Sequence, residues 1–152
     1  MIDLDATDRA LLRAISRDAS QSAGALGRAC GLSQPAAWRR IRRLEQAGVI
    51  KGRRVRLNAE ALGFGVTVFL GVKLARKGQV SLDDFERAVG AIPEVQTVEH
   101  VLGLYDYRLR VVARDLSDFE RVLRRRIMTL PGAGEVEANV LLSEERLPGP
   151  LG

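Results

Sequence analysis

Four arginines within five positions, in the stretch GLSQPAAWRRIRRLEQAGVIKG, are the residues best suited to chemistry. A guanidinium group can donate in pairs to phosphate oxygens and to the O6 and N7 atoms of guanine. At about 100° per residue, Arg39 and Arg43 fall opposite Ile41 and Leu44 on a helix. Glu45 is the only acid in this helix, so few compensating pairs are expected along the basic side. The helix can therefore bury one side and present arginines on the other.

Three interpretations of these arginines are a solvated helix face, a membrane-surface strip and a DNA contact. The helix follows a short turn at residues 31–33 and precedes a second basic segment, residues 51–56. A winged helix-turn-helix has this order, with the second helix in the major groove and the wing along the backbone. A membrane-surface helix needs a larger bulky apolar face than Trp38, Ile41 and Leu44 supply. The pattern favours double-stranded DNA as the partner.

The start of the arginine helix is where side chains usually reach base edges. The candidates there are Ser33, Gln34, Ala36, Ala37, Arg39 and Arg40. Among these we favour Gln34, Arg39 and Arg40. Phosphate contacts are expected from the rest of the basic set, namely Arg42, Arg43, Lys51, Arg53 and Arg54. Trp38 borders the apolar stripe and is expected to pack between helices.

The charge of the chain is unevenly distributed. Its net charge is +5, but residues 1–57 hold 12 basic and 5 acidic residues, whereas residues 58–152 hold 12 basic and 14 acidic ones. This asymmetry indicates a polyanion-binding part joined to a part with another task. The single cysteine, Cys30, excludes an internal disulfide and is expected to be buried. No apolar run approaches a membrane span and the first residues are acidic, so we expect a cytoplasmic protein without membrane contact.

Helical spacing in residues 1–57 predicts three helices followed by a wing. The first covers about 6–18 and begins at Asp5 or Thr7, and the second runs from Ser20 or Ser22 to Cys30. Gly31 ends the second in a left-handed conformation. The third begins at Ser33 and runs to about residue 47, where Gly48 stops it. Residues 49–57 alternate as a short hairpin or edge strand, and residues 58–65 form a linker.

Residues 66–152 alternate between strand-like and helix-like patterns of apolar residues, which predicts a second domain. Strands are expected at 66–74, 95–102, 107–113 and 135–142, with a tight turn at 103–106. Helices are expected to begin at Ser81 and Ser117. The order β-α-β-β-α-β is typical of a ferredoxin-like sandwich, with two helices on one face of an antiparallel sheet. The predicted fold class is therefore α+β, with an N-terminal winged helix-turn-helix.

Four stretches together resemble the Lrp/AsnC, or feast/famine, family of transcription regulators. They are LDATDRALLRAISRDAS, the arginine stretch quoted above, VLGLYDYRLRVV and LPGAGEVEANVLL. The resemblance covers nearly the whole chain. It implies a winged helix-turn-helix and a C-terminal effector and dimerisation domain of the RAM type. It also implies a small effector, commonly an amino acid, and homodimers that assemble into tetramers, octamers or larger discs.

The family's effector pocket lies between dimers, around the turn that joins the second and third strands. The resemblance places this turn at Gly103, Leu104, Tyr105 and Asp106, with His100 and Asn139 nearby. Backbone amides in such a turn can hold a carboxylate, and Asp106 can accept from an ammonium group. The same four residues could equally form a hairpin turn without a ligand. Leu104 replaces an acid or polar residue of the family pattern, and Ala138 and Asn139 replace its threonine. These departures favour a hydrophobic effector, with a different ligand or no effector as the alternatives.

The leading hypothesis is a sequence-specific, effector-modulated transcription regulator without a cofactor or a metal. An architectural protein that compacts DNA with weak specificity is the alternative. Siroheme decarboxylases are similar in fold, which makes an enzyme a remote third alternative. His100 is the only histidine, and the sequence holds neither a Ser/His/Asp set nor a cluster of metal ligands. We therefore do not expect an enzyme.

Overall fold

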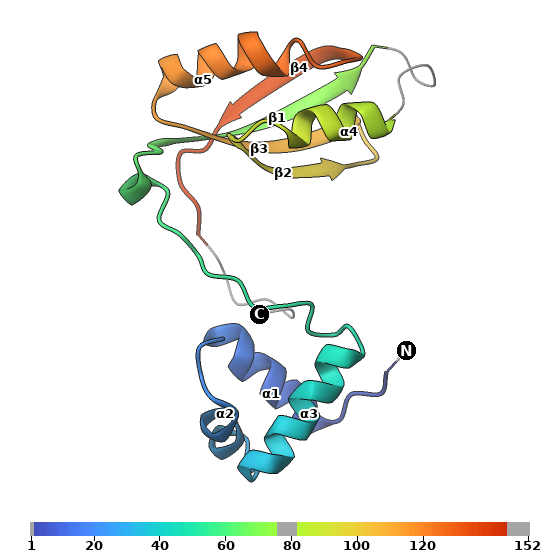
Figure 1. Cartoon of the computed structure of the whole chain (residues 1–152), viewed down its shortest axis with the longest axis vertical. Helices are drawn as coiled ribbons and strands as arrows, with labels where there is room; N and C mark the ends of the chain where they lie inside the picture. Colours follow the sequence, from blue (N-terminus) through green and yellow to red (C-terminus); the bar gives the residue numbers. More distant parts are fainter. Residues whose placement is uncertain (1, 76–81, 146–152) are drawn as a thin grey trace. The chain divides into compact units, whose positions relative to one another are not determined.

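The computed structural model describes residues 2–75 and 82–145 (Figure 1). The chain divides into two compact units, one reaching Arg56 and the other spanning Leu57–Glu144. The domain ranges 1–57, 58–65 and 66–152 stay a prediction. The helix start expected at Ser81 lies outside the described residues.

The first unit contains three helices, α1 (Ala6–Arg17), α2 (Ala23–Ala29) and α3 (Gln34–Gln46). Their N-caps are Asp5, Ser22 and Ser33, whose side chains each accept a backbone N–H of the first turn. Gly31 and Gly48 follow α2 and α3 with φ of +69° and +71°, a conformation that favours glycine. The three predicted helices are confirmed within two residues at each end.

The core of the first unit brings the three helices together. Its fully or nearly buried side chains are Leu11, Ile15, Leu26, Ala37 and Ile41. Gly27 lets α2 approach α3 closely, because a Cβ there would lie 3.0 Å from the Ala37 Cβ. Cys30 packs against this core but is only partly buried, so the prediction of a buried thiol was too strong.

The hairpin or edge strand predicted for residues 49–57 is wrong, because no strand forms there. The amides of Val49 and Ile50 both donate to the Leu44 carbonyl, so the chain leaves α3 in a turn. Residues 51–57 are exposed and pair with no strand among the described residues. Their charges repel one another and stay hydrated, and an isolated pair of short strands is marginal in water. In the linker, Glu60–Leu62 forms a short 3₁₀ helix.

The second unit is a four-stranded sheet with the order β2-β3-β1-β4 (Figure 1). The strands are β1 (Val66–Leu74), β2 (Val95–His100), β3 (Tyr107–Ala113) and β4 (Ala133–Val140), and each neighbouring pair is antiparallel. Helices α4 (Leu82–Gly90) and α5 (Leu116–Val122) pack on one face. The predicted ferredoxin-like α+β sandwich is confirmed, although β2 ends two residues early and β4 begins two residues early.

The core of this unit lies between the helices and the sheet. Alternate residues of β1 and β3 point into it, and its fully buried members include Val68, Leu70, Val72, Phe85, Val89, Tyr107, Leu109 and Val111. The rings of Phe85 and Tyr107 lie 4.6 Å apart between centroids. The Tyr107 hydroxyl donates to Glu86 Oε1 over 2.9 Å, which satisfies the one polar atom of this buried ring.

The two tyrosines of the chain are expected to ionise late. Burial and the hydrogen bond to Glu86 raise the pKa of Tyr107 to about 12, and the bond from Tyr105 to Glu137 raises the pKa of Tyr105. Because an unfolded tyrosine ionises near pH ~10, Tyr107 stabilises the fold fully below that pH. This stabilisation is lost as the pH rises towards 12. Absorbance titration should show both phenols ionising above the ordinary tyrosine pKa, and Tyr107→Phe should remove the transition near pH 12. A normal titration of both phenols would contradict this.

Helix α5 differs from its prediction at both ends. Asp115, not Ser117, is the N-cap and accepts from the Asp118 amide over 2.7 Å, so the helix starts at Leu116. A charged carboxylate caps a helix well, and its position sets the first turn. At the other end the helix widens into a π turn, Leu123–Ile127, in which the Met128 amide donates to the Leu123 carbonyl over 2.8 Å. The sequence predicted a regular helix here.

Candidate DNA-binding surface and effector site

The outer side of α3 is basic and exposed. Arg39 makes no hydrogen bond or ion pair with any residue that the structure describes, and its side chain is exposed. Gln34 and Gln46 are also exposed on this helix, at its two ends. The free guanidinium of Arg39 can enter a DNA groove and donate to base edges or to phosphates.

The inner side of the same arginine cluster is neutralised by α1. Asp8 is completely buried, and its carboxylate accepts from Arg40 Nη1 over 2.9 Å and from Arg43 Nη2. Asp5 accepts from the same Arg40 nitrogen over 2.6 Å. Asp5 and Asp8 also form the capping box of α1. The pairs therefore join the start of α1 to the middle of α3.

Two of the predicted base-reading residues are corrected by this geometry. Ala37 is fully buried in the core and cannot meet a base. Arg40 turns towards α1, where two carboxylates occupy its guanidinium, so it is withdrawn from the favoured set. The pattern of the arginine helix alone does not indicate these pairs, because both acids lie more than 30 residues away, at the start of α1. Of the favoured residues, Gln34 and Arg39 remain exposed.

Trp38 was predicted to pack between helices, and this prediction is wrong. Its side chain is 55% exposed, and the Arg42 guanidinium carbon lies 5.8 Å from the centre of its ring. The two side chains line a hollow of about 650 Å³ together with Lys51 and Arg53. The sequence did hold one indication of this exposure, because Trp38 lies at the border of the apolar stripe and not at its centre. The predicted phosphate contacts Arg42, Lys51 and Arg53 are thus brought to one hollow.

The predicted effector turn is a loop between β2 and β3. The Val101 amide donates to the Asp106 carbonyl over 3.0 Å, which closes the loop around residues 102–105. Leu104 and Gly103 are exposed, and no atom would obstruct a Cβ at Gly103 within 4 Å. Asp106 is tied to β1, since its carboxylate accepts from the Leu74 amide over 2.9 Å.

Tyr105 folds back from this loop over β1. Its ring lies against Gly71, where a Cβ would come within 2.5 Å of a ring carbon, so the close approach requires glycine. Its hydroxyl donates to Glu137 on β4, and the Asn139 amide donates to the same carboxylate over 3.0 Å. Both bonds lower the pKa of Glu137, and the bond from Tyr105 has the larger effect. Glu137 therefore joins the predicted residues Tyr105 and Asn139.

Sequence reasoning missed Glu137, although the alternation of the last strand placed it two residues from Asn139 on the same face. His100 is not joined to this group by any contact that the structure describes. It is exposed and stacks on the core residue Tyr107, with ring centres 4.8 Å apart. No cluster of three potential metal ligands occurs among the described residues, and none of the described helices could cross a membrane.

Family models match both units of the chain. The winged helix-turn-helix DNA-binding model matches residues 4–51, and the Lrp/AsnC ligand binding domain matches residues 67–148. The chain belongs to the Lrp/AsnC family. It is therefore a DNA-binding transcription regulator with a ligand-binding domain, in agreement with the resemblance of its sequence.

Lrp/AsnC relatives match along nearly the whole chain. The proline dehydrogenase transcriptional activator of Rhizobium radiobacter is 33% identical over 97% of this chain and 94% of its own length. The leucine-responsive regulatory protein of Escherichia coli K12 is 32% identical over 93% and 87%, respectively. The transcriptional activator DecR of the same organism is 30% identical over 93% of both chains.

Solved Lrp/AsnC structures have the same fold. A transcriptional regulator of Neisseria meningitidis in complex with L-methionine has a TM-score of 0.90 at 25% identity, covering 99% of this chain and 97% of that one. A feast or famine regulatory protein of M. tuberculosis complexed with L-methionine has a TM-score of 0.85 at 30% identity, covering 95% and 96%.

Proposed function

We propose that this Lrp/AsnC regulator reads DNA with Gln34 and Arg39 and holds the backbone with a surrounding set of basic residues. The backbone set is Arg42, Arg43, Lys51, Arg53 and Arg54, while Ser33 and Ala36 stay candidates for base edges. Arg43 stays in the set because only its Nη2 bonds Asp8 and its side chain is 48% exposed. The observation that carries this proposal is the exposed Arg39, whose guanidinium has no partner among the described residues. Base contacts give specificity and phosphate contacts give affinity, so the two sets have separable effects.

The proposed effector is an amino acid with an apolar side chain. Support comes from the ligand-binding family match and from two similar regulators that were solved with L-methionine. The exposed Leu102 and Leu104 offer apolar surface beside the turn, and Gly103 leaves its backbone open to a ligand. The site would be completed between dimers, so the proposal includes tetramers or octamers. It also includes a cytoplasmic location and no enzymatic activity.

Replacing Gly103 by valine tests the effector proposal. The position has open space and a backbone conformation accessible to other residues, so folding should be unaffected. The added side chain would cover the turn, so the thermal shift produced by the best amino acid should fall by more than half. The measurement is a thermal-shift screen of all amino acids, followed by light scattering with each hit.

The matched control is Gly90→Val at the end of α4, where a Cβ also meets nothing within 4 Å. It should leave the amino-acid response intact. If no amino acid changes the melting temperature, the oligomer distribution or the operator affinity of the unsubstituted protein, the effector proposal fails. If specific and random DNA bind equally across a salt series, the architectural alternative replaces sequence-specific regulation.

A further inference from the structure

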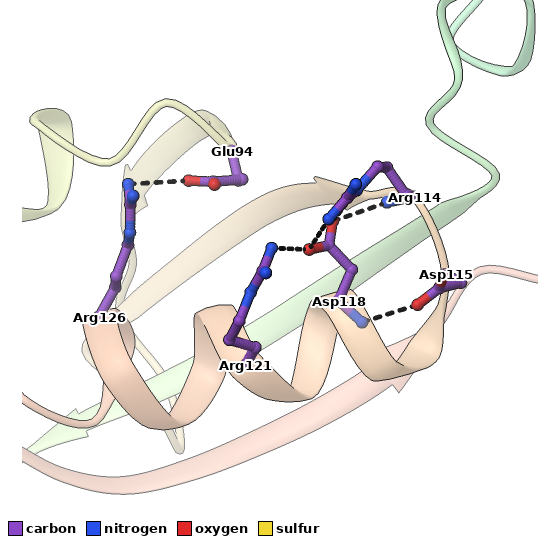
Figure 2. Close-up of polar contacts among 6 residues, drawn as sticks. All are labelled: Glu94, Arg114, Asp115, Asp118, Arg121 and Arg126. Atoms are coloured by element: carbon purple, nitrogen blue, oxygen red, sulfur yellow. Dashed lines mark hydrogen bonds and ion pairs between the residues drawn. The ribbon is translucent and has the colours of Figure 1, made fainter.

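A second basic site lies on the C-terminal unit and shares no lining residue with the loop of residues 102–105. Arg121, Arg125 and Arg126 line a hollow of about 340 Å³ beside Glu94 and Val122. Arg121 lies in α5 and the other two arginines lie in the π turn that follows it. Figure 2 shows Arg121 and Arg126 leaving the same side of this helix. Three guanidinium groups therefore share one depression with a single carboxylate.

The carboxylates near this hollow do not neutralise it. Glu94 accepts from Arg126 Nη1 over 3.3 Å, and Asp118 accepts from Arg121 (Figure 2). The Asp118 carboxylate is shared with Arg114. Arg114 Nε donates to Asp118 Oδ2 over 3.2 Å, and Arg114 Nη2 donates over 3.0 Å to Oδ1, which also accepts from Arg121. The Arg125 guanidinium has no hydrogen bond or ion pair with any described residue. The hollow is therefore left with unneutralised positive charge.

The π turn brings Arg126 to the side of the helix that Arg121 and Arg125, four residues apart, share in a regular helix as well. In a regular helix, residues five apart point in different directions, whereas i→i+5 hydrogen bonding widens the turn and aligns them. All three arginines line the hollow. The core fixes the turn, since Val122 and Ile127 are both buried. The π turn therefore places arginines together at the surface, an arrangement that the packing of the core does not require.

We propose that Arg121, Arg125 and Arg126 bind phosphate groups, and that these phosphates belong to the DNA backbone. Guanidinium groups match phosphate oxygens in geometry and charge. Val122 is the only apolar residue of the lining, which disfavours an apolar ligand. The side chains of Arg121 and Arg126 are about half exposed, at 51% and 48%. Exposed cations bind a polyanion by releasing its counterions, whereas a single small anion gains little from them.

The occupation of this hollow by DNA would make the C-terminal unit a second contact surface for the DNA that α3 binds. Residues 58–152 as a whole hold more acidic than basic residues, so overall attraction of the unit does not supply this contact. The inference rests on DNA binding by the family but not on which residues of α3 read bases. A contact of this kind requires DNA long enough to pass both units.

The test compares two double variants of the full chain on long and short DNA carrying the same operator. Arg121→Gln with Arg125→Gln removes two charges from the hollow. The control, Arg87→Gln with Arg124→Gln, removes two helix arginines that do not line it. Binding is measured by gel shift across a series of salt concentrations. On long DNA we expect the salt slope of the hollow variant to fall by about 2, from a contribution of about 0.9 per phosphate.

The control should keep the slope of the unsubstituted protein, and short DNA should not distinguish the two variants. An unchanged slope on long DNA overturns the proposal. Equilibrium dialysis with inorganic pyrophosphate tests whether the hollow is a small-anion site. The assignment to DNA is overturned if the hollow variant loses pyrophosphate binding while its salt slope for DNA binding stays unchanged. Arg39→Ala is measured in parallel. Its loss of operator binding is independent of the hollow, so failure of either contact is recognised separately.

Discussion

Replacing Arg39 by alanine is expected to weaken operator binding by about 10- to 100-fold, which corresponds to one good base or phosphate contact in a groove. Arg39 is exposed and has no partner among the described residues, so its removal leaves the fold intact. The measurement is fluorescence anisotropy with DNA from upstream of the protein's own gene. Single base-pair substitutions in that DNA show whether the loss is specific to one position.

The matched control is Arg17→Ala in the last turn of α1, which removes an exposed arginine outside α3. It should change operator affinity less than twofold. If Arg39→Ala behaves like this control, the outer side of α3 does not enter the groove. If it weakens specific and random DNA equally, Arg39 holds a phosphate and the reading of bases falls to Gln34.

Replacing Asp8 by alanine is expected to destabilise the first unit by about 2 kcal/mol. The substitution removes the N3 carboxylate that accepts the Asp5 amide and the acceptor of two charged hydrogen bonds, while the N-cap bond from the Asp8 amide to Asp5 stays. The Arg40 and Arg43 side chains are 32% and 48% exposed, so water screens these pairs and lowers their contribution. Arg40 keeps Asp5 as a partner.

Trp38 makes this prediction easy to measure. It is the only tryptophan and lies in α3, so its fluorescence follows the unfolding of the first unit in urea. Asp3→Ala is the control, because Asp3 is exposed and makes no hydrogen bond or ion pair with any described residue. A midpoint for Asp8→Ala equal to that of Asp3→Ala would show that the buried carboxylate does not join the two helices.

Local pattern was enough to predict most of the architecture. Helix caps such as Ser33 and strands such as 66–74 follow from neighbouring residues, because capping and alternation act over one or two turns. The order of elements then restricts the topology to few choices. The π turn was not predicted, since the residues around Leu123 read equally well as a regular helix.

The sites were predicted less well because they depend on residues distant in sequence. Asp8 lies 32 residues from Arg40, so no helical pattern links them. Glu137 likewise meets Tyr105 only after β1 and β4 have paired. Trp38 lay at the border of the apolar stripe, where periodicity does not decide between core and surface. The turn at Gly103 was located through family resemblance, because its residues alone are also those of an ordinary hairpin.

The contact between Gly71 and Tyr105 has an evolutionary consequence. The ring of Tyr105 occupies the space that any side chain at position 71 would need. Gly71 is fixed by its pairing with β3, and Tyr105 is held by its bond to Glu137. A substitution at Gly71 alone should therefore be selected against, while one accompanied by a smaller residue at 105 can be accommodated. Among regulators that share this strand pairing, the two positions should covary, with bulk at one excluding bulk at the other.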